Sequence, residues 1–267
     1  MDLSTVTGFR PARERADLDL RPGEALVAGG SWLFSEPQPH LTGLVDLTTM
    51  GWPDWELTDG SLSIAATCTL TRLHDAPVPP GIARLVRHCT DALAMSFKIQ
   101  HVATLGGNLC LALPAGALIS LTAALDAVAL VWTPDGGERR EPVADLVRGP
   151  GETSLAPGEV LRSVEVPAAS LAARTSYRKT ALNTIGRSAS VVIGRTDADG
   201  PTTVTLTAAT TRPVLLRFPA LPSAGELDAA VAAVEEWYDD AHGAPDWRAA
   251  VTRTLAREVL DDLREGR

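Results

Sequence analysis

Two pairs of adjacent glycines are the residues in this chain whose type and spacing could do chemistry. Gly106 and Gly107 lie in the segment HVATLGGNL, between apolar runs and beside a threonine and an asparagine. Gly29 and Gly30 lie upstream in ALVAGGSWL, after a short apolar run. Each pair predicts a tight turn, because glycine tolerates positive φ and lets a ligand approach the backbone N–H groups. Two such turns can hold one diphosphate through amide donors, without a basic side chain.

Neither pair fits Gly-x-Gly-x-x-Gly, and neither is followed by Gly-Lys-Ser or Gly-Lys-Thr. The Rossmann fingerprint and the P-loop are therefore absent. A single Gly-Gly is most often only a turn, but each of these follows an apolar strand and precedes a polar residue. The repeated pattern favours a dinucleotide held by the backbone. No Ser-His-Asp or paired-carboxylate arrangement stands out, so we predict no catalytic side chain on this chain.

The composition narrows the class of protein. The 267 residues carry a formal net charge of −9 with no cluster of Lys and Arg, which argues against a nucleic-acid partner. The first residues do not resemble a signal peptide, and the apolar runs are too short to span a bilayer, so we expect a cytoplasmic protein with no membrane contact. Cys68, Cys89 and Cys110 lack the short spacings of zinc or iron–sulfur sites, which predicts no metal site.

The hydrophobic pattern predicts a protein of mixed helices and strands. Beyond residue 176 strands come first and a long helical tail follows, which predicts a separate α+β domain. The predicted strands are 25–28, 44–47, 61–66, 127–132, 161–167, 176–180, 188–194, 202–207 and 213–218. The predicted helices are 13–20, a short piece at 31–34, 82–93, 118–125, 226–240 and 246–263. We expect one domain over 1–168, with lobes of about 1–55 and 56–168, and a second domain over 172–267.

The glycine segments also resemble a known family. VAGGSWL resembles the Ala-Gly-Gly-x-x-Leu turn of the FAD-binding subunits of molybdenum hydroxylases, the group of xanthine dehydrogenase, aldehyde oxidase and carbon monoxide dehydrogenase relatives. IQHVATLGGNL is similar to their Ile-Arg-Asn-x-Ala-Thr-Ile-Gly-Gly-Asn-Leu segment. Pro114, LDA at 125–127, YRK at 177–179 and HGAPDWR at 242–248 follow in the family's order. The resemblance covers nearly the whole chain.

The resemblance implies a two-lobed FAD-binding domain of the vanillyl-alcohol-oxidase/PCMH type, followed by a small α+β C-terminal domain. It also implies residues on two sides of the FAD diphosphate. On one side these are Ala28, Gly29, Gly30, Ser31, Trp32 and Leu33. On the other side, toward the ribityl chain, these are Thr104, Gly106, Gly107, Asn108 and Leu109. Leu161 would line the flavin pocket, and Lys179 would reach the flavin.

The function that the resemblance implies is electron relay. The chain would be the FAD-binding subunit of a multi-subunit molybdenum hydroxylase, with a molybdopterin-binding subunit and an iron–sulfur subunit as partners. Electrons would reach FAD from the iron–sulfur clusters and leave to NAD or another acceptor. Two alternatives stay open: a stand-alone FAD oxidoreductase of related fold, and an assembly or scaffold relative that has lost FAD.

Three expectations follow for the site. Gly29, Gly30, Gly106 and Gly107 should line one cleft with their amides facing the diphosphate, and Gly107→Val should abolish flavin binding. Ala117 stands where many family members have an Asp that binds a cofactor hydroxyl. The absence of this Asp predicts weaker FAD binding. Ala117→Asp should then restore tighter binding.

Overall fold

The computed structural model describes residues 3–93, 97–183 and 186–266. A small parallel sheet at one end has the order β1-β3-β2, with strands β1 (Gly8–Pro11), β2 (Glu24–Val27) and β3 (Gly43–Asp46). An antiparallel sheet has the order β4-β5-β10-β6-β7, with strands β4 (Trp55–Thr58), β5 (Ser61–Ala65), β6 (Val128–Trp132), β7 (Glu138–Pro142) and β10 (Val160–Val166). A second antiparallel sheet has the order β11-β12-β13-β14, with strands β11 (Arg174–Ala181), β12 (Ser188–Thr196), β13 (Thr202–Thr207) and β14 (Val214–Phe218). The short pair is β8 (Val147–Gly149) and β9 (Glu152–Thr153).

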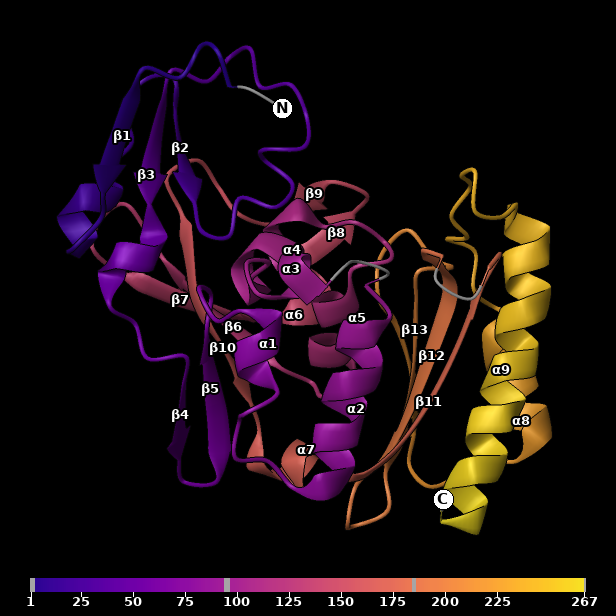
Figure 1. The fold of residues 1–267 in the computed structure, drawn as a ribbon. Coiled ribbons are helices and arrows are strands. Elements are labelled where there is room, and N and C mark those ends of the chain that lie inside the picture. The colour runs from indigo at the N-terminus through magenta and orange to yellow at the C-terminus, as the bar shows by residue number, and fades with distance from the viewer. Residues whose placement is uncertain (1–2, 94–96, 184–185, 267) are drawn as a thin grey trace.

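Helices separate and cover these sheets. The α-helices are α1 (Leu70–Leu73), α2 (Pro80–Asp91), α3 (Phe97–Gln100), α4 (Leu105–Leu111), α5 (Ala117–Ala124), α6 (Val143–Leu146), α7 (Ala168–Leu171), α8 (Ala224–Ala232) and α9 (Pro245–Glu265). Two 3₁₀ helices are η1 (Arg15–Leu18) and η2 (Leu47–Met50). Figure 1 shows α2 and α5 between the two antiparallel sheets, and α8 and α9 on the outer face of the β11–β14 sheet.

The helices of the middle layer have the sequence pattern that their position requires. α2 starts at a proline and buries Ile82, Leu85, Val86 and Cys89 on one face, as an amphipathic helix does. All residues of α5 are buried, because it packs between a helix and a sheet and has no solvent-facing side. The layers share one core, in which Ile64 of β5 and Val191 of β12 belong to the same cluster of buried side chains.

The mixed helix-and-sheet class is confirmed, and most predicted elements are present within a few residues. Three helix predictions are wrong. The short helix over 31–34 is a turn. The helix over 13–20 is only the single 3₁₀ turn η1, and the helix over 226–240 ends with α8. After α8 the chain turns back, because Trp237 forms a β-bridge with Thr210 and Tyr238 N–H donates to the Ala209 carbonyl. The boundary at 168–172 stays a prediction, since the shared core extends across it.

Stacked cations and indoles join the parallel sheet's lobe to β6 and β10. The Arg162 guanidinium lies 4.3 Å from the ring centroid of Trp52 and 5.8 Å from that of Trp132. Arg15 of η1 lies 4.7 Å from the Trp132 ring, and the two indoles meet edge to face at 5.5 Å. Such contacts favour a fixed orientation of the elements they connect. They therefore fix how this lobe is oriented on β6 and β10.

Candidate functional site

The first glycine pair forms a loop directly after β2. Gly30 has φ of 64°, and its carbonyl accepts the Phe34 N–H at 2.9 Å, which closes a single helical turn. A Cβ at Gly30 would lie 2.3 Å from the Phe34 ring, which would have to move, and the positive φ itself favours glycine. Within the described parts of the chain, the backbone N–H groups of residues 29–33 have no hydrogen-bond acceptor. Consecutive free amides of this kind form a concave site for an anion.

The second glycine pair differs from the predicted turn, because it lies inside helix α4. Thr104 is the N-cap, and its Oγ1 accepts the Gly107 N–H at 3.1 Å. Gly106 N–H donates to the Ala66 carbonyl at 2.8 Å. The expectation that all four glycine amides face a diphosphate is therefore wrong for Gly106 and Gly107, whose N–H groups already have protein acceptors.

The two glycines of α4 have different roles. A Cβ at Gly106 would lie 2.7 Å from the Ala66 Cβ, so glycine allows α4 to pack closely on the segment after β5. Gly107 is exposed, and its nearest neighbour would be Thr104 Oγ1 at 3.1 Å. Gly107 therefore leaves an uncovered backbone surface on α4 that a ligand can approach.

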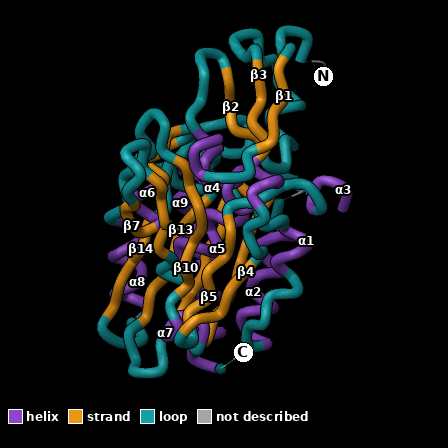
Figure 2. The backbone as a smooth tube through the Cα atoms, turned by 90° about the vertical axis from the view of Figure 1, so that its left-hand side faces the viewer, coloured by secondary structure: helices purple, strands orange, loops and turns teal. Residues whose placement is uncertain are grey.

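The fold brings the two segments together across the lobes. A Cβ on Gly29 would lie 1.6 Å from the Val102 carbonyl oxygen, so the loop after β2 touches the backbone that leads into α4. Figure 2 shows α4 directly beside the end of the β1–β3 sheet. The free N–H groups of residues 29–33 are thus next to the second segment that the sequence analysis predicted to bind the cofactor.

Asn108 connects α4 to α5. Its Oδ1 accepts the N–H groups of Leu118 at 2.9 Å and Ile119 at 3.4 Å. This carboxamide replaces a side-chain cap, since the N-cap residue of α5 is Gly116. The second glycine segment, which begins at Thr104, therefore also fixes the start of α5.

The other predicted positions divide by burial. Ala28, Ser31 and Leu33 are half-buried, and Trp32 is 41% exposed. Leu109 and Leu161 are buried in the main core, where they support the site by packing.

Lys179 is half-buried on β11. Because side chains alternate along a strand, Lys179 shares a face with Tyr177, opposite to Arg178. Arg178 faces α9, where it pairs with Glu258 and Asp262. Lys179 therefore faces the same side as Tyr177, toward α2.

Ala117 is the first residue of α5 and is 3% exposed. It lines a small closed pocket together with Tyr177 and Ser188, which the sequence had not marked as site residues. The Tyr177 ring stacks on His88 with centroids 5.3 Å apart, and burial raises the pKa of the Tyr177 hydroxyl. Side chains alternate along a strand, so the sequence could have placed Tyr177 on the same face as the predicted site residue Lys179. No sequence pattern indicated Ser188.

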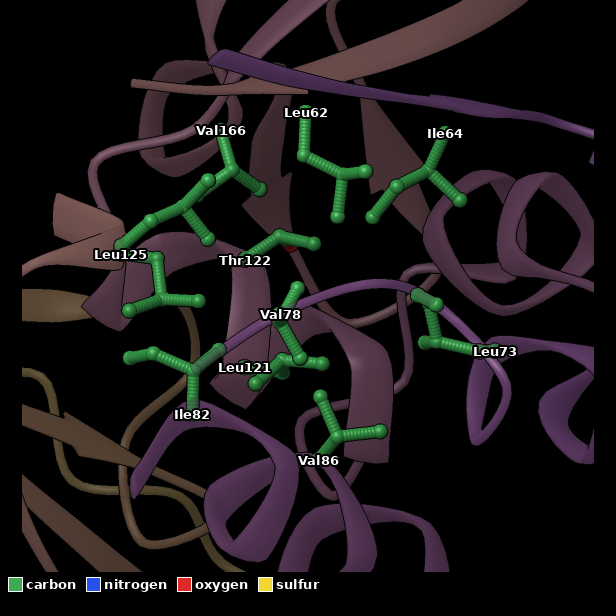
Figure 3. A pocket seen from close by; sticks show the side chains of 12 residues that line it. Leu62, Ile64, Leu73, Val78, Ile82, Val86, Leu121, Thr122, Leu125 and Val166 are labelled. Carbon is green, nitrogen blue, oxygen red and sulfur yellow. The ribbon is translucent and has the colours of Figure 1, made fainter. Parts of the chain in front are cut away.

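Two other spaces lie in the described structure, and the first is too small for a dinucleotide. An apolar cavity of about 10 Å³ between β5, α2 and α5 is lined by side chains such as Leu62, Ile82 and Leu121 (Figure 3). It is apolar and no larger than one water, so it stays dry. A groove of about 230 Å³ lies along α2 and β11, with His88 and Tyr177 on its wall.

Metal binding has no visible basis in the described ranges, where no three His, Cys, Asp or Glu side chains group together. Burial raises the pKa of the Cys68 thiol to about 12, so it stays protonated at neutral pH. No helix within these ranges is long and apolar enough to cross a membrane.

A comparison with known protein families identifies the family of the chain. Residues 14–169 match the family described as the FAD binding domain in molybdopterin dehydrogenase. No curated protein matches the sequence significantly.

Solved structures with the same fold cover the whole chain. A chain of quinoline 2-oxidoreductase from Pseudomonas putida 86 has a TM-score of 0.82 and 21% identity, over 100% of this chain and 99% of that one. Reconstituted CO dehydrogenase from Oligotropha carboxidovorans has a TM-score of 0.81 and 21% identity, over 98% of both chains. Carbon monoxide dehydrogenase from Hydrogenophaga pseudoflava, lacking the Mo-pyranopterin moiety, has a TM-score of 0.79 and 20% identity, over 96% of both. These likenesses confirm the predicted fold.

Proposed function

Because the chain belongs to the family of FAD-binding domains of molybdopterin dehydrogenases, we propose that it is the FAD subunit of a cytoplasmic complex of the xanthine dehydrogenase kind. A molybdopterin-binding subunit oxidises the organic substrate, and an iron–sulfur subunit delivers the electrons to this chain. The electrons leave to NAD or another soluble acceptor. Bound FAD supplies the electron-transfer chemistry, and the chain's own residues bind it and control access to it.

One observation carries this proposal: the free backbone N–H groups of residues 29–33, in a loop that rests on the segment leading into α4. A diphosphate is the part of FAD that such donors fit, since it presents several anionic oxygens to neutral amides. The loop needs no lysine or arginine for this, which agrees with the acidic composition of the chain. The segment in contact with this loop, at Val102 and Ala103, leads directly into α4 with its exposed Gly107.

The chain's role in the complex is structural and electronic, without proton-transfer chemistry of its own. The side chains at the loop and at the start of α4 include Ser31, Trp32, Thr104 and Asn108, and none of these four is a general acid or base at neutral pH. Substrate chemistry therefore belongs to a partner chain. Electrons from that partner must enter across an interface.

The test is flavin binding and partner-dependent activity. The purified chain, titrated with FAD, should bind about one equivalent with a flavin absorbance spectrum, and the isolated chain should oxidise no organic substrate. A slow transfer of electrons from NADH to a dye is expected if NAD is the acceptor. Failure to bind FAD would instead support the scaffold relative, and rapid turnover of an organic substrate by the isolated chain would support a stand-alone oxidoreductase.

A further inference from the structure

The groove of about 230 Å³ lies at the β11 end of the second antiparallel sheet, with charged side chains along its walls. Within the described residues β11 is an edge strand and pairs with β12 alone. Figure 1 shows α2 on one face of this sheet and α9 on the other. Arg84 and His88 of α2 form one wall, Arg178 comes from β11, and Asp262 comes from α9. The groove therefore joins elements from both sides of the predicted domain boundary.

The carboxylate of the groove is already neutralised. Asp262 is 8% exposed, and its Oδ2 accepts the Ser176 hydroxyl at 2.7 Å and lies 2.6 Å from Arg178 Nη2. Arg178 also donates through Nε to Glu258 at 3.2 Å and through Nη1 to the Tyr177 carbonyl at 3.0 Å. A guanidinium has more N–H groups than these contacts use, so Arg178 keeps donors for a further acceptor.

The donors of the α2 wall are unused. Within the described parts of the chain, neither the Arg84 guanidinium nor the His88 ring has a hydrogen bond or an ion pair. The two residues are one helical turn apart, so they lie on the same side of α2. The His88 ring is held against β11, because it stacks on Tyr177 with the ring planes 7° apart. Unused donors thus line the groove from both α2 and β11.

We infer that this groove binds a small organic anion whose carboxylate or phosphate oxygens bridge α2 and β11. Arginine holds such oxygens through charge-assisted hydrogen bonds, which are stronger than neutral ones. The chain carries a formal net charge of −9, so attraction of an anion depends on these local donors and not on the overall charge.

The size of the groove limits the ligand. Its volume of about 230 Å³ is below the range for drug-sized ligands, about 300–1,000 Å³, so a dinucleotide or a peptide strand is too large for it. None of residues 29–33 lines the groove, so this site is separate from the proposed FAD diphosphate site. The ligand contacts elements on both sides of the groove, and it therefore stabilises the folded state when it binds.

The experiment titrates the full chain, without FAD, with citrate and with inorganic phosphate at constant ionic strength, followed by calorimetry. Arg84→Gln removes charge-assisted hydrogen bonds, so affinity should fall at least about 10-fold. His88→Phe keeps an aromatic ring against Tyr177 but removes the ring nitrogens, so affinity should fall about 3- to 10-fold. At about ten times its Kd, the bound anion should raise the melting temperature of the wild type by about 3–6 °C. Arg84→Gln should lose most of that shift at the same concentration.

Arg87→Gln is the matched control. Arg87 is exposed on the same helix but does not line the groove, so this variant loses the same charge and should bind both anions as the wild type does. Tighter binding of citrate would support a carboxylate ligand, and tighter binding of phosphate would support a phosphate ester. The inference would be overturned if the wild type bound neither anion, or if Arg84→Gln and Arg87→Gln lost equal affinity. Because the titration contains no FAD, neither result bears on the proposed function.

Discussion

The two Gly-Gly pairs have the same sequence and opposite structural roles. At Gly29 and Gly30 the chain forms an irregular loop whose N–H groups are free. At Gly106 and Gly107 it forms the first turn of α4, whose N–H groups bond to Ala66 and Thr104. The first pair therefore offers donors to a ligand, whereas the second allows close packing and leaves an open surface.

This difference shows that a glycine pair does not by itself indicate a ligand-binding backbone. The backbone N–H groups of a glycine pair can bind a ligand only if nearby carbonyl and hydroxyl oxygens do not already accept their hydrogen bonds. Ala66 lies in the segment after β5 and reaches Gly106 only through the tertiary fold. The substitutions that follow test this division of roles.

Gly29→Ala should have the largest effect. Its Cβ would lie 1.6 Å from the Val102 oxygen, so the loop and the segment before α4 must separate. Loss of even two amide–phosphate bonds would weaken FAD binding by at least about 100-fold. Flavin fluorescence titration measures this. Gly225→Ala adds a methyl group with nothing within 4 Å and should bind FAD normally. Unchanged affinity in Gly29→Ala would contradict the assigned role of the first pair.

Gly106→Ala should act on stability more than on affinity. The added Cβ would meet the Ala66 Cβ at 2.7 Å and its carbonyl oxygen at 2.9 Å. Overpacking of this kind destabilises by about 1–3 kcal/mol, partly offset by the better helix propensity of alanine. Urea unfolding of the apoprotein measures the change. If stability were unaffected and FAD binding were lost, both glycine pairs would bind the ligand directly.

Gly107→Val should lower FAD affinity while the fold is retained. Gly107 is exposed, so the side chain adds bulk on the uncovered surface of α4. We expect a loss of about 10-fold or more, equivalent to about 1.4 kcal/mol. The smaller Gly107→Ala should lose less. A Gly107→Val protein with full flavin content would remove α4 from the site.

Ala117→Asp should no longer be expected to improve FAD binding. The position is 3% exposed, so a carboxylate there is desolvated. We expect equal or up to about 5-fold weaker binding, a loss of up to about 1 kcal/mol. Ala117→Asn separates charge from size. Tighter binding in the Asp variant would mean that a carboxylate reaches the cofactor after all.

The smallest effect concerns the strand that leads into the first loop. Hydrogen bonds from Arg10, with a further one from the Arg21 N–H, lower the pKa of Glu24 to about 2. Since the folded-state pKa is depressed, this stabilisation is present above the ordinary pKa of about 4.5 and is lost as the pH falls toward 2. Melting temperatures of Glu24→Gln should therefore show a weaker decline over that range than the wild type. Glu36→Gln, at an exposed loop position, is the control.

The sequence predicted the fold better than it predicted the site's geometry. Strand β2, helix α2 and the positions of strands β11 to β14 along the chain follow from local periodicity, which needs no knowledge of distant contacts. The helical state of Gly106 depends on the Thr104 cap and on Ala66, which is brought close only by β5. Tyr177 and Ser188 line one pocket only through the tertiary fold, and no local pattern encodes that.

The core shared between the two antiparallel sheets has a consequence for cooperativity. Val191 and Ile193 of β12 pack in the same cluster as Leu118 and Leu121 of α5. Truncation after α7 would expose this apolar surface, so the lobes that surround the glycine loop are not a free-standing module. A ligand bound at that loop stabilises, by mass action, every element that unfolds with it. Ligand binding at the glycine loop is therefore thermodynamically coupled to the folding of α9 at the opposite end of the molecule.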